Sequence, residues 1–66
     1  MTIELNGQRR EIRDGTTVGA LILAETGSAR GSAAVVDGEV VPRSAWDELA
    51  LHDGQVVELI TAVQGG

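Results

Sequence analysis

The chain has 66 residues, no cysteine and one histidine, His52, which excludes a disulfide framework and a structural zinc site built from cysteine and histidine. Its net charge is −5 and all five basic residues are arginines, so no basic stripe is available to bind nucleic acid. The sequence begins without the charged and apolar regions of a signal peptide, and no apolar run reaches membrane-spanning length. We therefore expect one small cytoplasmic domain with an aliphatic core and no membrane partner.

Two short strands joined by a tight turn are predicted at the start of the chain. Asn6-Gly7 separates the segments TIEL and QRREIR, and Asn-Gly between alternating segments is the strongest short hairpin signal. We predict strands at about 2–6 and 9–13. The two aliphatic residues of the first strand, which alternate with polar ones, should share its buried face.

The segment DGTTVGALILAETG predicts the single helix. Thr16 or Thr17 can cap its N-terminus, and Gly27 suits the left-handed position that commonly ends a helix. Gly19 inside this helix costs about 1 kcal/mol relative to alanine. That cost suggests close packing of the helix against the sheet, although chance placement explains the glycine as well.

Three further strands are predicted in the second half of the chain. The segment AAVVDGEVVPR holds two apolar runs around Asp37-Gly38, which indicates another hairpin. Pro42 cannot donate a ladder hydrogen bond, so the second of these strands should be short or lie at an edge. A helical turn and loop follow, in which Trp46 should cover the core, and the last strand should span about 55–62.

The predicted order is strand, strand, helix, strand, strand, strand. Such an order favours an α+β fold in which one helix packs on one face of a mixed sheet of four to five strands. This is the β-grasp, or ubiquitin-like, arrangement, with the first and last strands paired in parallel at the sheet centre. We expect a β-grasp domain over 1–62 and a flexible C-terminal tail over 63–66.

The side chains indicate little chemistry. Asp47-Glu48 and His52-Asp53 are pairs of neighbours whose side chains usually point apart, so a solvated surface is favoured over an acid–base pair. No serine has an adjacent base that would activate it, and the glycines lack the spacing of a phosphate-binding loop. The sequence therefore predicts no catalytic residue and no metal ligand.

The remaining reactive group is the α-carboxylate of Gly66. It would end a tail of four residues that reaches at most ~14 Å beyond the last strand. Because Gly65 and Gly66 carry no Cβ, the tail from Gln64 onward can thread a narrow channel in another protein. A partner enzyme could then activate the carboxylate with ATP as an acyl-adenylate. The alternative is that the two glycines are accidental.

The chain resembles the ThiS-type sulfur carrier proteins over nearly its whole length. The resemblance lies in the opening TIELNG, the helix start DGTTVGALI, the hairpin segment AAVVDGEVVPRSAW and the ending DGQVVELITAVQGG. It implies a carrier rather than an enzyme, with no bound cofactor. An E1-like enzyme of the ThiF or MoeB type would use ATP to adenylate Gly66. Sulfur relayed from cysteine through a desulfurase would give a thiocarboxylate, and a thiazole synthase of the ThiG type would accept that sulfur for thiamine biosynthesis.

A surface for docking these partners is predicted from the facing of the strands. Val35, Ile60 and Ala62 are expected on the sheet face away from the helix, where clustered aliphatic side chains can bind another protein. The acidic net charge is compatible with a basic partner surface. Scattered aliphatic residues, or residues covered by loops, are an equal alternative for this face.

Several other functions stay open at this point. The small subunit of molybdopterin synthase has similar terminal chemistry, but such proteins tend to be longer and richer in aromatic residues, whereas this chain has no Phe or Tyr. A sulfur carrier for cysteine or another metabolite is hard to separate from the ThiS type. A ubiquitin-like protein modifier and a plain interaction domain with an inert tail complete the alternatives.

Overall fold

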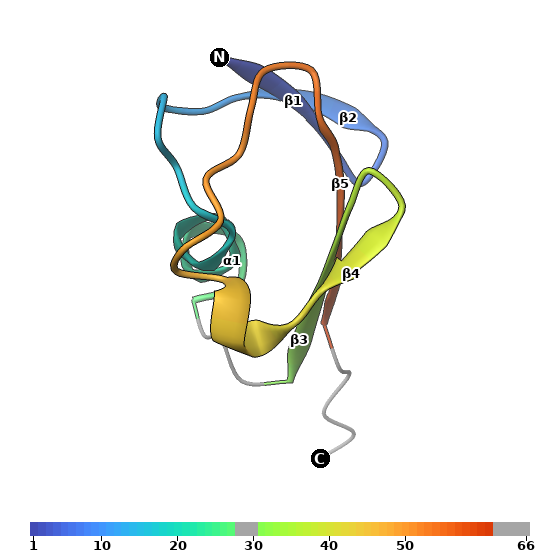
Figure 1. The fold of residues 1–66 in the computed structure, drawn as a ribbon. Helices are drawn as coiled ribbons and strands as arrows, with labels where there is room; N and C mark the ends of the chain where they lie inside the picture. Colours follow the sequence, from blue (N-terminus) through green and yellow to red (C-terminus); the bar gives the residue numbers. More distant parts are fainter. Residues whose placement is uncertain (28–30, 62–66) are drawn as a thin grey trace.

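The computed structural model describes residues 1–27 and 31–61 (Figure 1). The elements follow the predicted order, and a short 3₁₀ turn lies at the start of the region where a helical turn and loop were expected. They are β1 (Thr2–Leu5), β2 (Gln8–Glu11), α1 (Val18–Thr26), β3 (Ser32–Val36), β4 (Glu39–Val41), the 3₁₀ turn η1 (Arg43–Ala45) and β5 (Val56–Thr61). Among these described residues, no helix has the length and apolar character needed to cross a membrane.

The five strands form one mixed sheet in the order β2-β1-β5-β3-β4. The first and last strands, β1 and β5, pair in parallel inside the sheet, and all other neighbours are antiparallel. Figure 1 shows α1 on one side of this sheet, next to η1 and the segment that leads to β5. This arrangement confirms the predicted β-grasp fold, and β4 is short and lies at an edge, as Pro42 indicated.

Both predicted hairpins have two-residue turns with positive backbone φ at each central residue. Asn6 and Asp37 each have a φ of 49°, and the glycines after them have φ values of 82° and 84°. Turns of this mirror-image type match the right-handed twist of the flanking strands, and Asn-Gly and Asp-Gly adopt them with little strain. The register follows directly, since Leu5 pairs with Gln8 across the first turn.

The helix begins and ends where the capping residues predicted. The hydroxyl of Thr17 accepts a hydrogen bond from the N–H of Ala20 at 3.1 Å, which satisfies one free donor of the first turn. Gly27 has a φ of 78° and donates its N–H to the carbonyl of Leu23 at 2.9 Å, which closes the last turn. Val18 is among the residues that α1 buries against the core.

Gly19 lies close to the turn after η1 rather than to the sheet. Its N–H donates to the carbonyl of Trp46 at 3.0 Å. A Cβ at this position would lie 3.5 Å from the Cβ of Trp46 and would collide with the side-chain carboxylate of Asp47. The prediction of a close approach was therefore right, but its partner was wrong, because a loop distant in sequence packs on this face of α1.

The core is aliphatic apart from one tryptophan. Trp46 is 5% exposed, and its Nε1–H donates to the carbonyl of Val41 at 2.9 Å, so its one polar atom is satisfied. This confirms that Trp46 covers the core. The buried hydrophobic residues are Ile3, Leu5, Val18, Leu21, Ile22, Ala34, Val36, Val41, Trp46, Leu51 and Val57.

Candidate functional site

The start of β5 is anchored by the turn between β3 and β4. The carboxylate of Asp37 accepts the N–H of Val56 at 2.9 Å, while its own N–H donates to the carbonyl of Val56 at 2.8 Å. The second carboxylate oxygen accepts from the side-chain amide of Gln55 at 3.1 Å. Along the rest of the strand β5 pairs continuously with β3, up to Thr61 opposite Ser32.

The other side of β5 is held by β1 and by a side chain from the turn that follows β1. The N–H of Asn6 donates to the carbonyl of Val57 at 2.9 Å, and its side-chain oxygen accepts the N–H of Leu59 at 2.8 Å. Because β1 ends at Leu5, the Asn6 side chain replaces the next main-chain acceptor. This contact extends the pairing of β5 by one hydrogen bond toward its C-terminal end.

Side chains of β5 alternate between the core and the outer face of the sheet, the face away from α1. Val57 is fully buried, whereas Val56 and Ile60 are 43% and 57% exposed. On the neighbouring strands, Val35 pairs with Val40, which is 72% exposed. We call the apolar residues of this face the outer patch, and they are Ala33, Val35, Val40, Val56 and Ile60.

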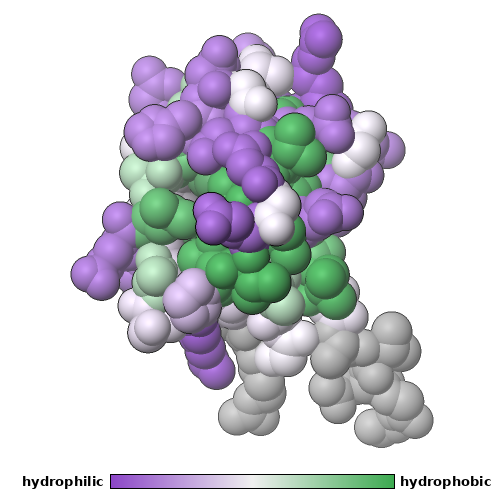
Figure 2. All heavy atoms as spheres, turned by 45° about the vertical axis from the view of Figure 1, so that its right-hand side comes forward, coloured by the Kyte–Doolittle hydropathy of each residue, from purple (hydrophilic) through white to green (hydrophobic). Residues whose placement is uncertain are grey.

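Figure 2 shows hydrophobic side chains gathered on this side of the molecule, with hydrophilic residues around them. One carboxylate lies within the outer patch, because Glu58 is placed between Val56 and Ile60 on the same face and opposite Val35. The ion pairs among the described residues involve Asp14 and Glu25, so none of them neutralises Glu58. The outer patch is thus an exposed apolar surface that contains a negative charge.

The structure places Val35 and Ile60 on the predicted face, with Val35 half-buried and Ile60 exposed. Ala62, the third residue predicted for this face, lies outside the described residues, as do those predicted for the tail, Gln64, Gly65 and Gly66. The predicted patch did not include Val40 and Val56, although strand alternation already placed Val56 on the same face as Ile60. The first could have been found, since the two-residue turn at Asp37-Gly38 requires Val40 to lie opposite Val35.

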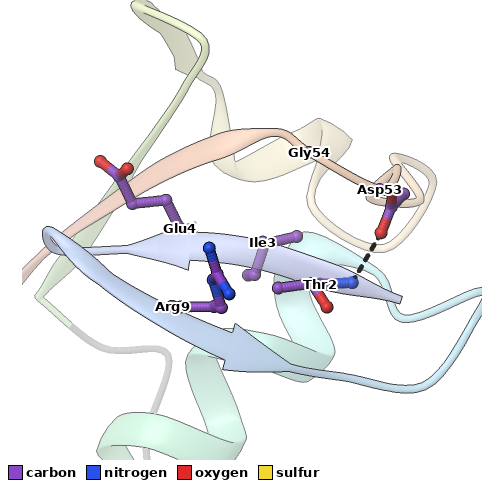
Figure 3. A pocket seen from close by; sticks show the side chains of 6 residues that line it. All are labelled: Thr2, Ile3, Glu4, Arg9, Asp53 and Gly54. Carbon is purple, nitrogen blue, oxygen red and sulfur yellow. Dashed lines mark hydrogen bonds between the residues drawn. The ribbon is translucent and has the colours of Figure 1, made fainter.

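A shallow depression lies at the other end of the outer face, between β1, β2 and the turn before β5 (Figure 3). The dashed line in Figure 3 marks the hydrogen bond from the backbone N–H of Thr2 to the carboxylate of Asp53, at 2.7 Å. This bond ties the turn before β5 to β1. Glu4 and Arg9 pair across the strands at its rim. Among the described residues, no group of three or more His, Cys, Asp and Glu could hold a metal ion. The hydrogen bond between Thr2 and Asp53 in this depression is thus a structural one.

The adjacent pairs Asp47-Glu48 and His52-Asp53 take part in backbone contacts rather than in a shared site. The carboxylate of Asp53 is used by Thr2, and the backbone N–H of His52 donates to the side-chain oxygen of Gln55 at 2.7 Å. Asp47 lies next to the first turn of α1. These positions fit the expectation of surface and loop roles for the four residues.

Comparison with known proteins gives a consistent result. The ThiS family model matches residues 3–66. A crystal structure of the thiamine biosynthesis protein (ThiS) from Geobacter metallireducens superposes with a TM-score of 0.83 at 28% identity, covering all of both chains. A solution structure of a thiamine biosynthesis protein from the same organism gives a TM-score of 0.83 at 26% identity, covering this whole chain and 88% of that one.

A curated relative described as a thiazole synthase, from Paramagnetospirillum magneticum (strain ATCC 700264 / AMB-1), is 34% identical over 67 residues. The match covers this whole chain but only 20% of the relative, so the chain spans about a fifth of that protein's length. The family match extends over nearly every residue, and the fold agrees with that of the solved relatives. The chain belongs to the ThiS family.

Proposed function

We propose that the chain is a sulfur carrier that uses the α-carboxylate of Gly66 and supplies sulfur for the thiazole ring of thiamine. The observation that carries this proposal is the family match, which runs through to Gly66 in a chain whose last described strand lies inside the sheet. The solved relatives are described as thiamine biosynthesis proteins, which supports the same pathway for this chain.

The chemistry at Gly66 has three steps. A carboxylate oxygen attacks the α-phosphorus of ATP on an E1-like enzyme of the ThiF or MoeB type, and pyrophosphate leaves. The terminal sulfur of a persulfide formed through the desulfurase then attacks the acyl carbon, and AMP leaves, which gives an acyl disulfide. A second thiol attacks the partner's sulfur of this disulfide, so that the thiocarboxylate leaves and the two thiols become a disulfide. The absence of cysteine from the chain suits the second step, because an internal thiol would compete for the acyl-adenylate.

The chain itself acts as a carrier and not as a catalyst. In this proposal the partner enzymes bind the β-grasp domain over 1–62, and the tail over 63–66 carries the carboxylate into their active sites in the cytoplasm. ATP and the sulfur donor are bound by the partners. Asp37 and Asn6 anchor opposite sides of β5, which supports a rigid base for the tail.

The outer patch is the proposed docking surface for these partners. Exposed aliphatic residues on one sheet face provide the apolar contact, and Glu58 among them favours a partner surface that places an arginine or lysine opposite it. A thiazole synthase of the ThiG type is the proposed sulfur acceptor. The relative described as a thiazole synthase supports this partner, since a fifth of that protein is similar to this chain.

The proposal is tested by intact-mass spectrometry of the chain with the E1-like enzyme of the same cell. With ATP, we expect the mass of an adenylate, and with a desulfurase, cysteine and a thiol reductant added, the mass of a thiocarboxylate. Deletion of Gly66 should abolish both products while the melting temperature stays unchanged. An unmodified mass would contradict the proposal if the same enzyme preparation adenylates another carrier protein in a control reaction.

A further inference from the structure

The backbone of β5 is paired along its whole length on one side but only in part on the other. On the β3 side the register is continuous to Thr61, opposite Ser32. On the β1 side the last hydrogen bonds along β5 run from the N–H of Asn6 to the carbonyl of Val57 and from the N–H of Leu59 to the side chain of Asn6. The backbone pairing of β5 therefore ends at different residues on its two sides.

Strand geometry identifies the groups left over. The backbone N–H and C=O of alternate residues point to the same side of a strand. Val57 and Leu59 use the β1 side, so the C=O of Leu59 and the N–H of Thr61 point there as well. Among residues 1–27 and 31–61, nothing pairs with these two groups, because the chain reverses at Asn6-Gly7.

We propose that the adenylating enzyme adds an extended segment to this open half-edge, pairing its backbone with the C=O of Leu59 and the N–H of Thr61. The inference rests on the proposed function and names how the enzyme would hold the chain just before its tail. Strand addition satisfies the free donor and acceptor by main-chain hydrogen bonds. It requires no new side chain from the carrier.

Two features favour this occupant. The half-edge lies five residues before Gly66, so a segment paired with Thr61 is already aligned with the chain that leads to the carboxylate. Glycines offer no side chains for recognition, and backbone hydrogen bonds are the contacts by which an extended Gly-Gly segment can be held. Ile60, 57% exposed on the adjacent outer face, offers an apolar contact beside the half-edge.

A second copy of the chain fits the half-edge less well. Among the described residues the open groups here are few, namely the C=O of Leu59 and the N–H and C=O of Thr61, and the Asn6-Gly7 turn of each copy would stand beside them. Longer edges exist at β2 and β4, where a self-association through strand pairing would have more groups to use. The half-edge at β5 is distinguished from these edges by its position next to the tail.

The first test uses a substitution that removes one backbone N–H donor. Thr61→Pro removes the N–H at residue 61, and the fold should tolerate it because this N–H has no partner and the ladder bond to β3 is made at Ile60. Thr61→Ala is the matched control, since it changes the side chain but keeps the N–H. We expect Thr61→Pro to bind the adenylating enzyme about 3- to 10-fold more weakly than Thr61→Ala, as for loss of one hydrogen bond.

The second test reads the amide directly, by hydrogen exchange of the Thr61 N–H with NMR detection in the wild-type chain. We expect fast exchange in the isolated chain at two concentrations, and at least tenfold protection when the adenylating enzyme is saturating. The N–H of Ile60, which is paired with β3, serves as a reference that is protected in both states.

Each other outcome overturns the inference in a recognisable way. An unprotected Thr61 amide in the saturated complex, with adenylation still observed by mass, overturns strand addition alone. Protection in the isolated chain that rises with concentration assigns the half-edge to a second copy, and protection independent of concentration assigns it to the chain itself. Failure of adenylation in the same sample overturns the proposed function and this inference with it.

Discussion

The side-chain oxygen of Asn6 accepts a hydrogen bond from the backbone N–H of Leu59 at 2.8 Å, across 53 residues of sequence. Through this contact the first hairpin turn holds the strand that leads to the tail. Asn6 therefore has two roles, because its φ of 49° also makes the turn. The residue that forms the first hairpin turn, near the N-terminus, thus also stabilises β5 near the other end of the chain.

Asn6→Gly is predicted to lower the free energy of unfolding by about 1 kcal/mol. Glycine keeps the positive φ without strain, so the loss combines the hydrogen bond to Leu59 with the greater freedom of glycine in the unfolded chain. Asn6→Asp, which retains an acceptor oxygen, should lose less. Urea unfolding measures the difference, and equal stabilities of the Gly and Asp variants would contradict the role assigned to this oxygen.

The effect of Gly19→Ala on the free energy of unfolding is predicted to depend on Asp47. Alanine favours the helix by about 1 kcal/mol, but its Cβ would force the Asp47 carboxylate away from the first turn of α1. A negative charge there stabilises the positive end of the helix dipole. We therefore expect Gly19→Ala to stabilise the chain more in the Asp47→Ala background than in the wild type. A double-mutant cycle from thermal unfolding measures this coupling, and strictly additive effects would contradict it.

Arg10 and Glu25 join β2 to α1 by a two-pronged ion pair. The two guanidinium nitrogens donate to the two carboxylate oxygens at 2.8 and 2.5 Å, and both side chains are partly exposed. We predict a coupling free energy of about 0.5–1 kcal/mol from a double-mutant cycle to alanine, reduced at 1 M salt. Arg10→Lys should lose most of it, because an ammonium cannot form the planar fork. A coupling of zero at low salt would show that the pair contributes nothing.

Ile60→Asp is predicted to impair adenylation without unfolding the chain. Ile60 is 57% exposed in the outer patch, so a charge there costs little in the isolated domain but disrupts an apolar interface. Leu23→Asp is the matched control, because Leu23 is 54% exposed but lies on α1. We expect kcat/KM for adenylation to fall at least tenfold, mainly through KM, for Ile60→Asp alone. Similar losses for both variants would argue against the outer patch as the docking surface.

Local signals were sufficient to predict most of the fold. Asn-Gly and Asp-Gly turns specify two-residue hairpins, and Thr17 and Gly27 bound the helix, because each acts through backbone geometry within a few residues. The parallel pairing of β1 with β5 followed from the order of the elements. The turns and the helix caps need no knowledge of distant contacts.

The rest depends on how distant segments meet. Gly19 lies close to Asp47, which is 28 positions further along the chain, and Leu59 donates a hydrogen bond to Asn6 across 53 positions. No local pattern predicts either contact. The face on which Val56 lies follows from strand alternation, whereas its 43% exposure depends on where the neighbouring strands end.

The central claim is that sulfur travels on Gly66 to the thiazole ring, and isotope transfer tests it most directly. The chain is converted to its thiocarboxylate with ³⁴S-labelled cysteine, purified, and incubated with the thiazole synthase of the same cell and that enzyme's other substrates. The account predicts that the thiazole product carries ³⁴S and that the chain returns to its carboxylate mass. A thiazole product without ³⁴S, or a thiocarboxylate that persists while product accumulates, would contradict it.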